Sequence, residues 1–420
     1  MTPTSPVGAT LIKGGTDTEK PPARATRLGP LLAATHLSWA FPAAAGLTLL
    51  QARLEELDPA TKLTHFAVLA TAGAVTALVS NITFGLLSDR TRSRHGRRNP
   101  WIAAGGLTAA CCLSAASFAD GFAGLLVLIV AFQIALNAML APLYAVLPDR
   151  VPSERLGKAS AWTGLGSLVG QSLGAVAAGA LVTAPTLGLR WLPWLVAAGA
   201  LLFFFMAPDT SSKDLARPRI SLRELGRGLL PPKDADFFWA LGGRLLALLG
   251  INLVLVYQLY VLTDHLHLST AHAGPVIALG AIVSALATGT AIAVCGPLSD
   301  RLRRRKVFIL AGTAVMAAAI VPLVLAPALW SFYLFTGAAA LGLGCFGAVD
   351  QALVAEVLPD QENRAKDLGF LNIANTMPQL LAPITAGLLV PAFGYPALFV
   401  LAIVLTLAGG LCVLPLRRVA

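Results

Sequence analysis

Long apolar segments alternate with short polar ones along almost the whole chain. A helix crosses the hydrocarbon layer of a membrane, roughly 30 Å thick, with about 20 predominantly apolar residues. Segments of this kind predict an all-α membrane protein with twelve transmembrane helices, at residues 30–52, 63–88, 101–119, 121–147, 158–184, 189–207, 236–263, 273–298, 307–328, 330–357, 367–391 and 394–416. The polar tail before them, residues 1–28, is expected to be disordered. Because no small-residue cleavage site follows it, we expect the first span to be permanent rather than a signal peptide.

Composition and charge agree with this interpretation. Hydrophobic residues make up 56% of the chain and charged residues only 12%, which is outside the range of soluble domains. With a cytoplasmic N-terminus, 27 of the 31 Lys and Arg residues fall on the cytoplasmic side, and only Arg53, Lys62 and Arg190 fall on the other. This positive-inside pattern predicts a multi-pass protein of the cell membrane with both termini cytoplasmic. It also explains the net charge of +10 without a nucleic acid partner.

The five cysteines lie within predicted spans and show neither a disulfide framework nor the spacing of a metal site. We interpret them as small apolar packing residues. The sequence therefore predicts no metal and no cofactor.

The second half of the chain repeats the first. The motif GLLSDR at 85–90 recurs as GPLSDR at 296–301, and VLPD at 146–149 recurs at 357–360, both at an offset of 211 residues. A third match follows at an offset of 208, between Gln171 with 178–182 and Gln379 with 386–390. Matches in the same order at nearly the same offset indicate an internal repeat, which is common in transporters.

The repeat predicts two pseudo-symmetric six-helix bundles. The first covers residues 29–207 and the second 236–420, with a cytoplasmic linker at 208–235. Prolines, among them Pro218, Pro231 and Pro232, and many charged residues favour a solvated connector for this linker, while the run 221–225 is suited to a short surface helix with a regulatory role.

The loop after the second span carries a family resemblance. The motif at 85–90, the basic stretch that follows and the ending Gly96-Arg97-Arg98-Asn99-Pro100-Trp101 resemble the signature loop of the major facilitator superfamily. The ending is similar to that of one branch, the glycoside-pentoside-hexuronide cation symporters and the sucrose/proton symporters. Residues 366–369, 372–374 and 378–379 and the seventh span support the same resemblance. It implies the two-bundle fold of that superfamily and transport by alternating access.

The resemblance also implies a gate at the cytoplasmic ends of the helices. Asp89 is placed to pair with the loop arginines and to face the N-terminus of a neighbouring helix, where carboxylates are favoured. Such contacts would hold the outward-open state and break in the inward-open state. The simpler alternative is that these charges anchor the loops at the headgroups. The candidate gating residues are Asp89, Arg90, Gly96, Arg97, Arg98, Asp149, Asp300, Arg301 and Asp360.

Two departures from related transporters argue against sodium coupling and against export of hydrophobic drugs. Sodium-coupled sugar symporters carry carboxylates in helices two and four, whereas the nearest polar residues here are Asn81 and Asn137. The fifth span, 158–184, lacks the Gly-Pro dipeptide of drug/proton antiporters. Its glycines instead predict close packing of helices within one bundle or between the two.

Ionisable residues at membrane depth are rare, and each is a functional hypothesis. Asp350 is the only acid well inside a predicted span, and Arg244 is the only base. Arg244 lies eight residues from Asp236, about 12 Å deep, and Asp350 lies seven from Val357, about 10 Å deep. We therefore predict an ion pair. It would either orient two helices or couple transport to protons, because a desolvated carboxylate takes up a proton and a paired one releases it.

Neutral polar side chains on the predicted spans are candidates for a central substrate cavity. Asn372, Asn375 and Gln379 share one face of the eleventh span. Amide and aromatic groups suit a neutral, hydroxyl-rich solute, although amides also bond across packed helices. The remaining candidates are Tyr257, Gln258, Tyr260, His36, Trp39, Gln133, Asn137 and Gln171.

These features predict a secondary active transporter for a small polar organic solute, with a sugar or glycoside favoured and protons as the coupling ion. Its expected partners are the solute, protons and the lipid bilayer, and its expected state is a monomer. The alternatives are an exporter of a small natural product or drug and a nontransporting membrane sensor or scaffold. An enzyme is not expected, since no nucleophile–base pair or metal cluster lies at membrane depth.

Overall fold

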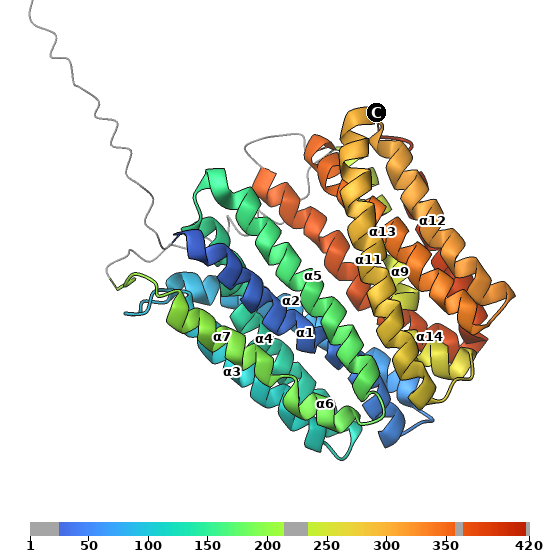
Figure 1. The fold of residues 1–420 in the computed structure, drawn as a ribbon, viewed down its shortest axis with the longest axis horizontal. Coiled ribbons are helices and arrows are strands. Elements are labelled where there is room, and N and C mark those ends of the chain that lie inside the picture. The colour runs from blue at the N-terminus through green and yellow to red at the C-terminus, as the bar shows by residue number, and fades with distance from the viewer. Residues whose placement is uncertain (1–24, 214–233, 358–363, 417–420) are drawn as a thin grey trace, which may run out of the picture.

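The structure is a computed structural model that describes residues 25–213, 234–357 and 364–416 (Figure 1). In this part of the chain every regular element is a helix. The elements are α1 (Ala25–Leu57), α2 (Lys62–Arg90), α3 (Asn99–Ala115), η1 (Ala116–Phe118), α4 (Phe122–Arg150), η2 (Ser153–Arg155), α5 (Leu156–Leu181), α6 (Pro185–Trp191), α7 (Trp194–Met206), α9 (Ala235–Leu255), α10 (Gln258–Tyr260), η3 (Val261–His265), α11 (Thr270–Leu302), α12 (Arg305–Leu325), α13 (Leu329–Val357) and α14 (Arg364–Leu411).

Ten helical segments of the described chain are long and apolar enough to cross a membrane. Two further spans complete the predicted twelve. One is α1, and the other arises because α14 is interrupted at Gly394, whose φ of 77° lies in the left-handed region that glycine tolerates. The predicted span at 189–207 differs in detail, since it is built from α6 and α7.

The helices form two bundles, with α1–α7 in one and α9–α14 in the other (Figure 1). Between the bundles, α5 contacts α11 and α2 contacts α14. We call the end with residues 91–98 and 303–304 the loop end, and the end with residues 58–61 and 266–269 the opposite end. In Figure 1, α5 and α11 converge toward the opposite end and diverge toward the loop end. The fold prediction is therefore confirmed.

Glycines let α5 approach α1 closely. A Cβ on Gly166 would lie 2.1 Å from the carbonyl oxygen of Ala33, and one on Gly174 would lie 2.2 Å from that of Phe41. A Cβ on Gly170, between them, would lie 2.8 Å from the carbonyl oxygen of Leu37. Small residues at every fourth position allow this backbone contact in membranes, where packing replaces the hydrophobic effect between helices. Further along α5, Gly179 meets Gly274 of the other bundle. The glycines of α5 therefore allow close packing both within the first bundle and between the two bundles.

Replacing Gly166 with Val should destabilise the protein by about 1–3 kcal/mol, because the added methyl groups overlap backbone atoms of α1. Gly164→Val is the matched control, since a Cβ at Gly164 meets nothing within 4 Å. The measurement is the thermal unfolding midpoint of the two purified variants in the same detergent. Equal midpoints would contradict the close approach of α1 and α5.

Candidate functional site

A charged pair lies inside the second bundle. Arg244 of α9 and Asp350 of α13 form an ion pair, with 3.1 Å between Nη1 and Oδ2. Both residues are buried, with 8% and 5% of their surfaces exposed. The pairing expected from their similar depths is therefore present, while its role in coupling stays a prediction.

The pair extends to a third helix. Arg244 donates a second hydrogen bond from Nε to Oδ1 of Asn375 in α14, at 3.0 Å. One guanidinium thus joins α9, α13 and α14, and its fixed planar donors suit such simultaneous contacts. Chemically, the site holds a carboxylate that is stabilised as an anion only while the guanidinium remains beside it. Separation of the two would favour protonation of Asp350.

Asn375 was expected in a substrate cavity together with its neighbours on the same helix face. The structure instead places its carbonyl oxygen on Arg244. Gln379, one turn further, is exposed. The side chain of Asn372 lies outside the described residues.

His36 of α1 lies close to α4 and beside Trp39 of its own helix. The ring centroid of His36 is 6.4 Å from that of Trp39 and 5.7 Å from that of Tyr144. His36 is buried, and its Nδ1 lies 2.8 Å from the carbonyl oxygen of Leu32, as expected for a satisfied interior histidine. The indole N–H of Trp39 is buried and has no hydrogen-bond partner in the part of the chain that the structure describes. Trp39 thus holds a buried donor that the described residues leave unsatisfied.

Amides connect α2 and α4 in the first bundle. Asn81 donates to Oδ1 of Asn137 at 3.3 Å, and Asn137 donates to the carbonyl oxygen of Gln133 at 2.9 Å. Asn137 is buried, whereas Asn81 is exposed. The amide of Gln133 lies near Gly73 of α2. These residues are therefore clustered, as a shared cavity requires.

Other candidates lie elsewhere. Tyr257 and Tyr260 are fully buried, and their hydroxyl groups donate to the carbonyl oxygens of Pro383 and Gln51, each at 3.0 Å. They belong to the contact between the bundles and not to the midplane cavity expected from the sequence, because their rings pack against Phe66 of α2. Gln171 is exposed and donates within its own helix, to Ser167. Gln258, which follows Tyr257 in the chain, is half-buried.

The opposite end is closed by an ion pair between the bundles. Nζ of Lys62 lies 2.6 Å from Oδ1 of Asp264 and 3.2 Å from Oε1 of Glu55. Tyr395 donates to the second carboxylate oxygen of Asp264 at 3.2 Å. Sequence reasoning missed this contact, because Lys62 and Asp264 are 202 residues apart at helix ends and share no periodic pattern. The only signal for Lys62 in the sequence is that it is one of the few basic residues outside the segments expected to be cytoplasmic.

A second contact lies beside this ion pair. The side-chain amide of Gln51 in α1 donates to the carbonyl oxygen of Val256, and Tyr260 donates to the carbonyl oxygen of Gln51. The contacts of Gln51, Lys62 and Tyr260 with the other bundle therefore all lie at the opposite end.

The signature loop forms a charge cluster at the loop end. Arg98 contacts Asp89 at 2.7 Å and Asp149 at 3.0 Å, and Arg97 contacts Asp149 at 2.8 Å. Arg98 is only 5% exposed and also donates to the hydroxyl of Ser88. All of these residues belong to the first bundle. The cluster therefore fixes the ends of α2, α3 and α4 relative to one another.

The start of the expected linker packs onto this loop. The backbone N–H of Ser212 donates to the carbonyl oxygen of Ser93 at 3.0 Å, and Asp209 pairs with Arg150 at 2.8 Å. Gly96 has a φ of 82° and lies against Asp209, where a Cβ would overlap the carboxylate. Residues 209–212 are thus part of the loop-end structure rather than a solvated connector. Residues 214–233 lie outside the described chain.

The second half repeats the motif with fewer contacts. Asp300 is 70% exposed and lies 3.7 Å from Arg305. The hydroxyl of Ser299, the counterpart of Ser88, is buried without a hydrogen-bond partner among the described residues. Arg90 and Arg301 are exposed. Asp360 lies outside the described residues.

The fold, the buried ion pair and the contacts between the two bundles are those of a polytopic membrane transporter. A sequence model of the Major Facilitator Superfamily matches residues 28–289 and 240–420. The chain therefore belongs to the Major Facilitator Superfamily, which is a family of transporters and not of enzymes.

Solved structures share this fold at low sequence identity. A D-xylose-proton symporter matches with a TM-score of 0.65 and 15% identity, covering 94% of this chain and 97% of its own. A bacterial homologue of the human lysosomal transporter Spinster, in an inward-facing and unoccupied conformation, matches with a TM-score of 0.63 and 17% identity. The latter alignment covers 94% of this chain and 95% of the homologue.

Removing one member of the buried pair should destabilise the protein by roughly 3–5 kcal/mol, because the other charge is left unpaired in a low dielectric. We expect this for Arg244→Gln and Asp350→Asn separately. The double variant should recover part of the loss, since it buries no charge. Thermal unfolding of the three purified variants measures this coupling. Additive effects of the two substitutions would show that the charges do not interact.

Asp264→Asn should loosen the opposite end, because it weakens the ion pair between the bundles. Spin labels at Thr64 and His272, both exposed at this end, report the separation of the bundles in a variant without the native cysteines. We expect the measured distance distribution to gain longer distances. Glu56→Gln is the control, since Glu56 pairs with Arg53 within α1. The same change in both variants would contradict a specific closing role for Asp264.

Proposed function

We propose that this protein couples the uptake of a small polar solute, with a sugar or glycoside favoured, to the movement of protons. The observation that carries the proposal is the buried pair of Asp350 and Arg244, which holds the one carboxylate at membrane depth in a state that conformational change can disturb. The resemblance of the signature loop to the sucrose/proton branch supports the same ion. The D-xylose-proton symporter of similar fold supports the same class of solute.

The charge distribution supports a cytoplasmic location for the loop end and for both termini. With this orientation, the contact of Lys62 with Asp264 joins the two bundles on the outer side. Asp89 then makes its ion pairs within its own bundle. In the outward-open state it would come near a helix N-terminus of the other bundle, which favours a carboxylate. Asp89 would in this way bias the equilibrium between the two states.

Polar groups of both bundles support the proposed solute class. Trp39 has a buried indole N–H without a partner among the described residues, and its ring has a flat apolar face. Asn81 and Gln133 carry amides on two neighbouring helices. Gln379 adds an exposed amide from the second bundle. Donors and acceptors beside an aromatic ring suit hydroxyl groups and the apolar face of a sugar.

Asp350→Asn should abolish solute accumulation driven by an inward proton gradient in proteoliposomes. Counterflow of the same solute should persist, because exchange between two filled compartments does not require net proton movement. The matched control is Asp120→Asn, an exposed acid in the turn before α4. Unchanged gradient-driven accumulation in Asp350→Asn would rule out the coupling role and leave the pair as a structural element.

The solute and the direction of transport are tested together. Purified protein is screened by thermal shift against sugars and glycosides, and any stabilising compound is tested for counterflow and for flux in everted vesicles. We expect sugars to stabilise and to exchange. Stabilisation by bulky amphiphiles alone, with flux out of cells, would replace the proposal with export of a small natural product. A stable protein that exchanges no solute would favour a sensor or scaffold.

A further inference from the structure

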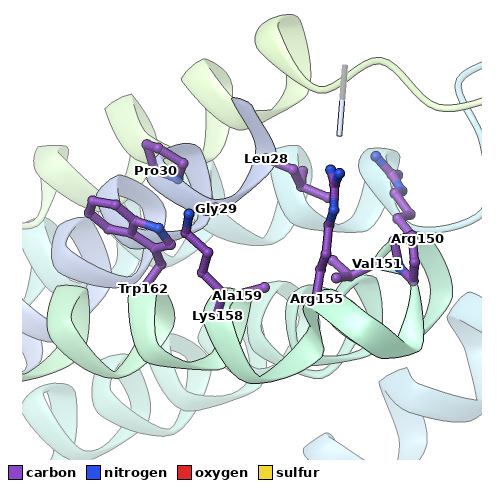
Figure 2. A pocket seen from close by; sticks show the side chains of 10 residues that line it. Leu28, Gly29, Pro30, Arg150, Val151, Arg155, Lys158, Ala159 and Trp162 are labelled. Atoms are coloured by element: carbon purple, nitrogen blue, oxygen red, sulfur yellow. The ribbon is translucent and has the colours of Figure 1, made fainter. Parts of the chain in front are cut away.

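A basic cavity lies at the loop end of the first bundle, apart from the polar residues discussed above. It has a volume of about 360 Å³ and is enclosed by the start of α1, the end of α4 and the start of α5 (Figure 2). Three cationic side chains line it, Arg150, Arg155 and Lys158. Apolar groups of Leu28, Pro30 and Trp162 form other parts of the wall. The cavity thus combines positive charge with an apolar surface.

The positive charge of this cavity is only partly compensated. Arg150 is paired with Asp209. Arg155 and Lys158 are exposed, and neither has an ion-pair partner in the part of the chain that the structure describes. Figure 2 shows the Arg155 side chain, at the end of η2 and directly before α5, between Leu28 and Arg150. Two free cations at the start of a long helix favour an anion, since the helix N-terminus carries partial positive charge as well.

An apolar stripe continues from the cavity along the same face of α5. Trp162, Leu165, Val169 and Leu173 are 36%, 50%, 36% and 48% exposed. Their spacing of three or four residues places them on one helix face, in line with Lys158. A cationic end followed by a row of exposed apolar side chains matches a molecule with an anionic head and an apolar tail. This stripe distinguishes a phospholipid from a free phosphate ester.

We propose that this cavity binds the phosphate headgroup of an anionic phospholipid, with Arg155 and Lys158 as the principal contacts. The acyl chains lie along the exposed stripe of α5, and Trp162 packs at the level where headgroup and chains meet. With the orientation proposed above, the cavity opens at the cytoplasmic leaflet, which carries the anionic lipids. Tryptophan is common at this level of a membrane.

The test uses the purified full-length protein and native mass spectrometry to measure binding of dioctanoyl phosphatidylglycerol, with dioctanoyl phosphatidylcholine as the zwitterionic comparison. Each basic residue near an anionic lipid surface contributes roughly fivefold to the attraction, so Arg155→Gln/Lys158→Gln should weaken phosphatidylglycerol binding by about 25-fold. The matched control is Arg303→Gln/Arg304→Gln, which removes two exposed charges from the loop end of the other bundle. The control should bind as the unmodified protein does.

Three outcomes would overturn the proposal. Equal weakening in both double variants would show that general charge and not this cavity holds the lipid. Equal binding of phosphatidylcholine would show that the anionic headgroup is not recognised. Binding of inorganic phosphate or glycerol phosphate as tightly as phosphatidylglycerol would assign the cavity to a free anion. The thermal unfolding midpoints of both double variants confirm folding, and none of these results depends on which solute the protein transports.

Discussion

Hydrocarbon tolerates neither free charge nor unpaired backbone groups, and this constraint accounts for most of the structure. It requires helices that satisfy their own backbone, and it drives almost all charged residues to the two ends of the molecule. Arg244 and Asp350 are the exception, and they are tolerated because each neutralises the other and Asn375 accepts a further hydrogen bond. The same constraint makes this pair sensitive to any motion that separates α9 from α13.

The two ends of the molecule are built differently. At the loop end, Arg97 and Arg98 join helices of the first bundle to one another. At the opposite end, Lys62 and Gln51 join the first bundle to the second. The contacts of Arg97 and Arg98 thus hold one bundle together, whereas those of Lys62 and Gln51 join the two bundles. Short-range polar contacts of the second kind are suited to an interface that must open and close.

Much of the fold could be predicted because hydrophobic length and the 211-residue repeat are properties of the sequence alone. The pairing of Arg244 with Asp350 could also be predicted, since the fixed rise of a helix converts residue number into depth. The rotation of each helix about its axis could not. Tyr257 and Tyr260 were therefore assigned to a cavity, although they face Phe66 in the contact between the bundles.

Contacts made by irregular segments were equally hidden from the sequence. The pairing of Lys62 with Asp264 depends on how two short connections place helix ends, and no periodic pattern records it. The packing of Ser212 on Ser93 is a backbone contact, which side-chain composition does not reveal. The composition of the linker suggested solvation, but its first residues complete the loop-end cluster.

The backbone contact of Gly179 with Gly274 has a mechanical consequence. Because α5 is held tightly along α1 by its other glycines, the two helices move as one stiff arm. From Gly179 to Lys158 this arm is about 30 Å long at the helical rise. A tilt of about 10° around the glycine contact would shift its far tip by about 5 Å, with hardly any sliding at the pivot. Because neither glycine carries a side chain at this contact, a slight rotation there would produce a large separation at the far end of the helices.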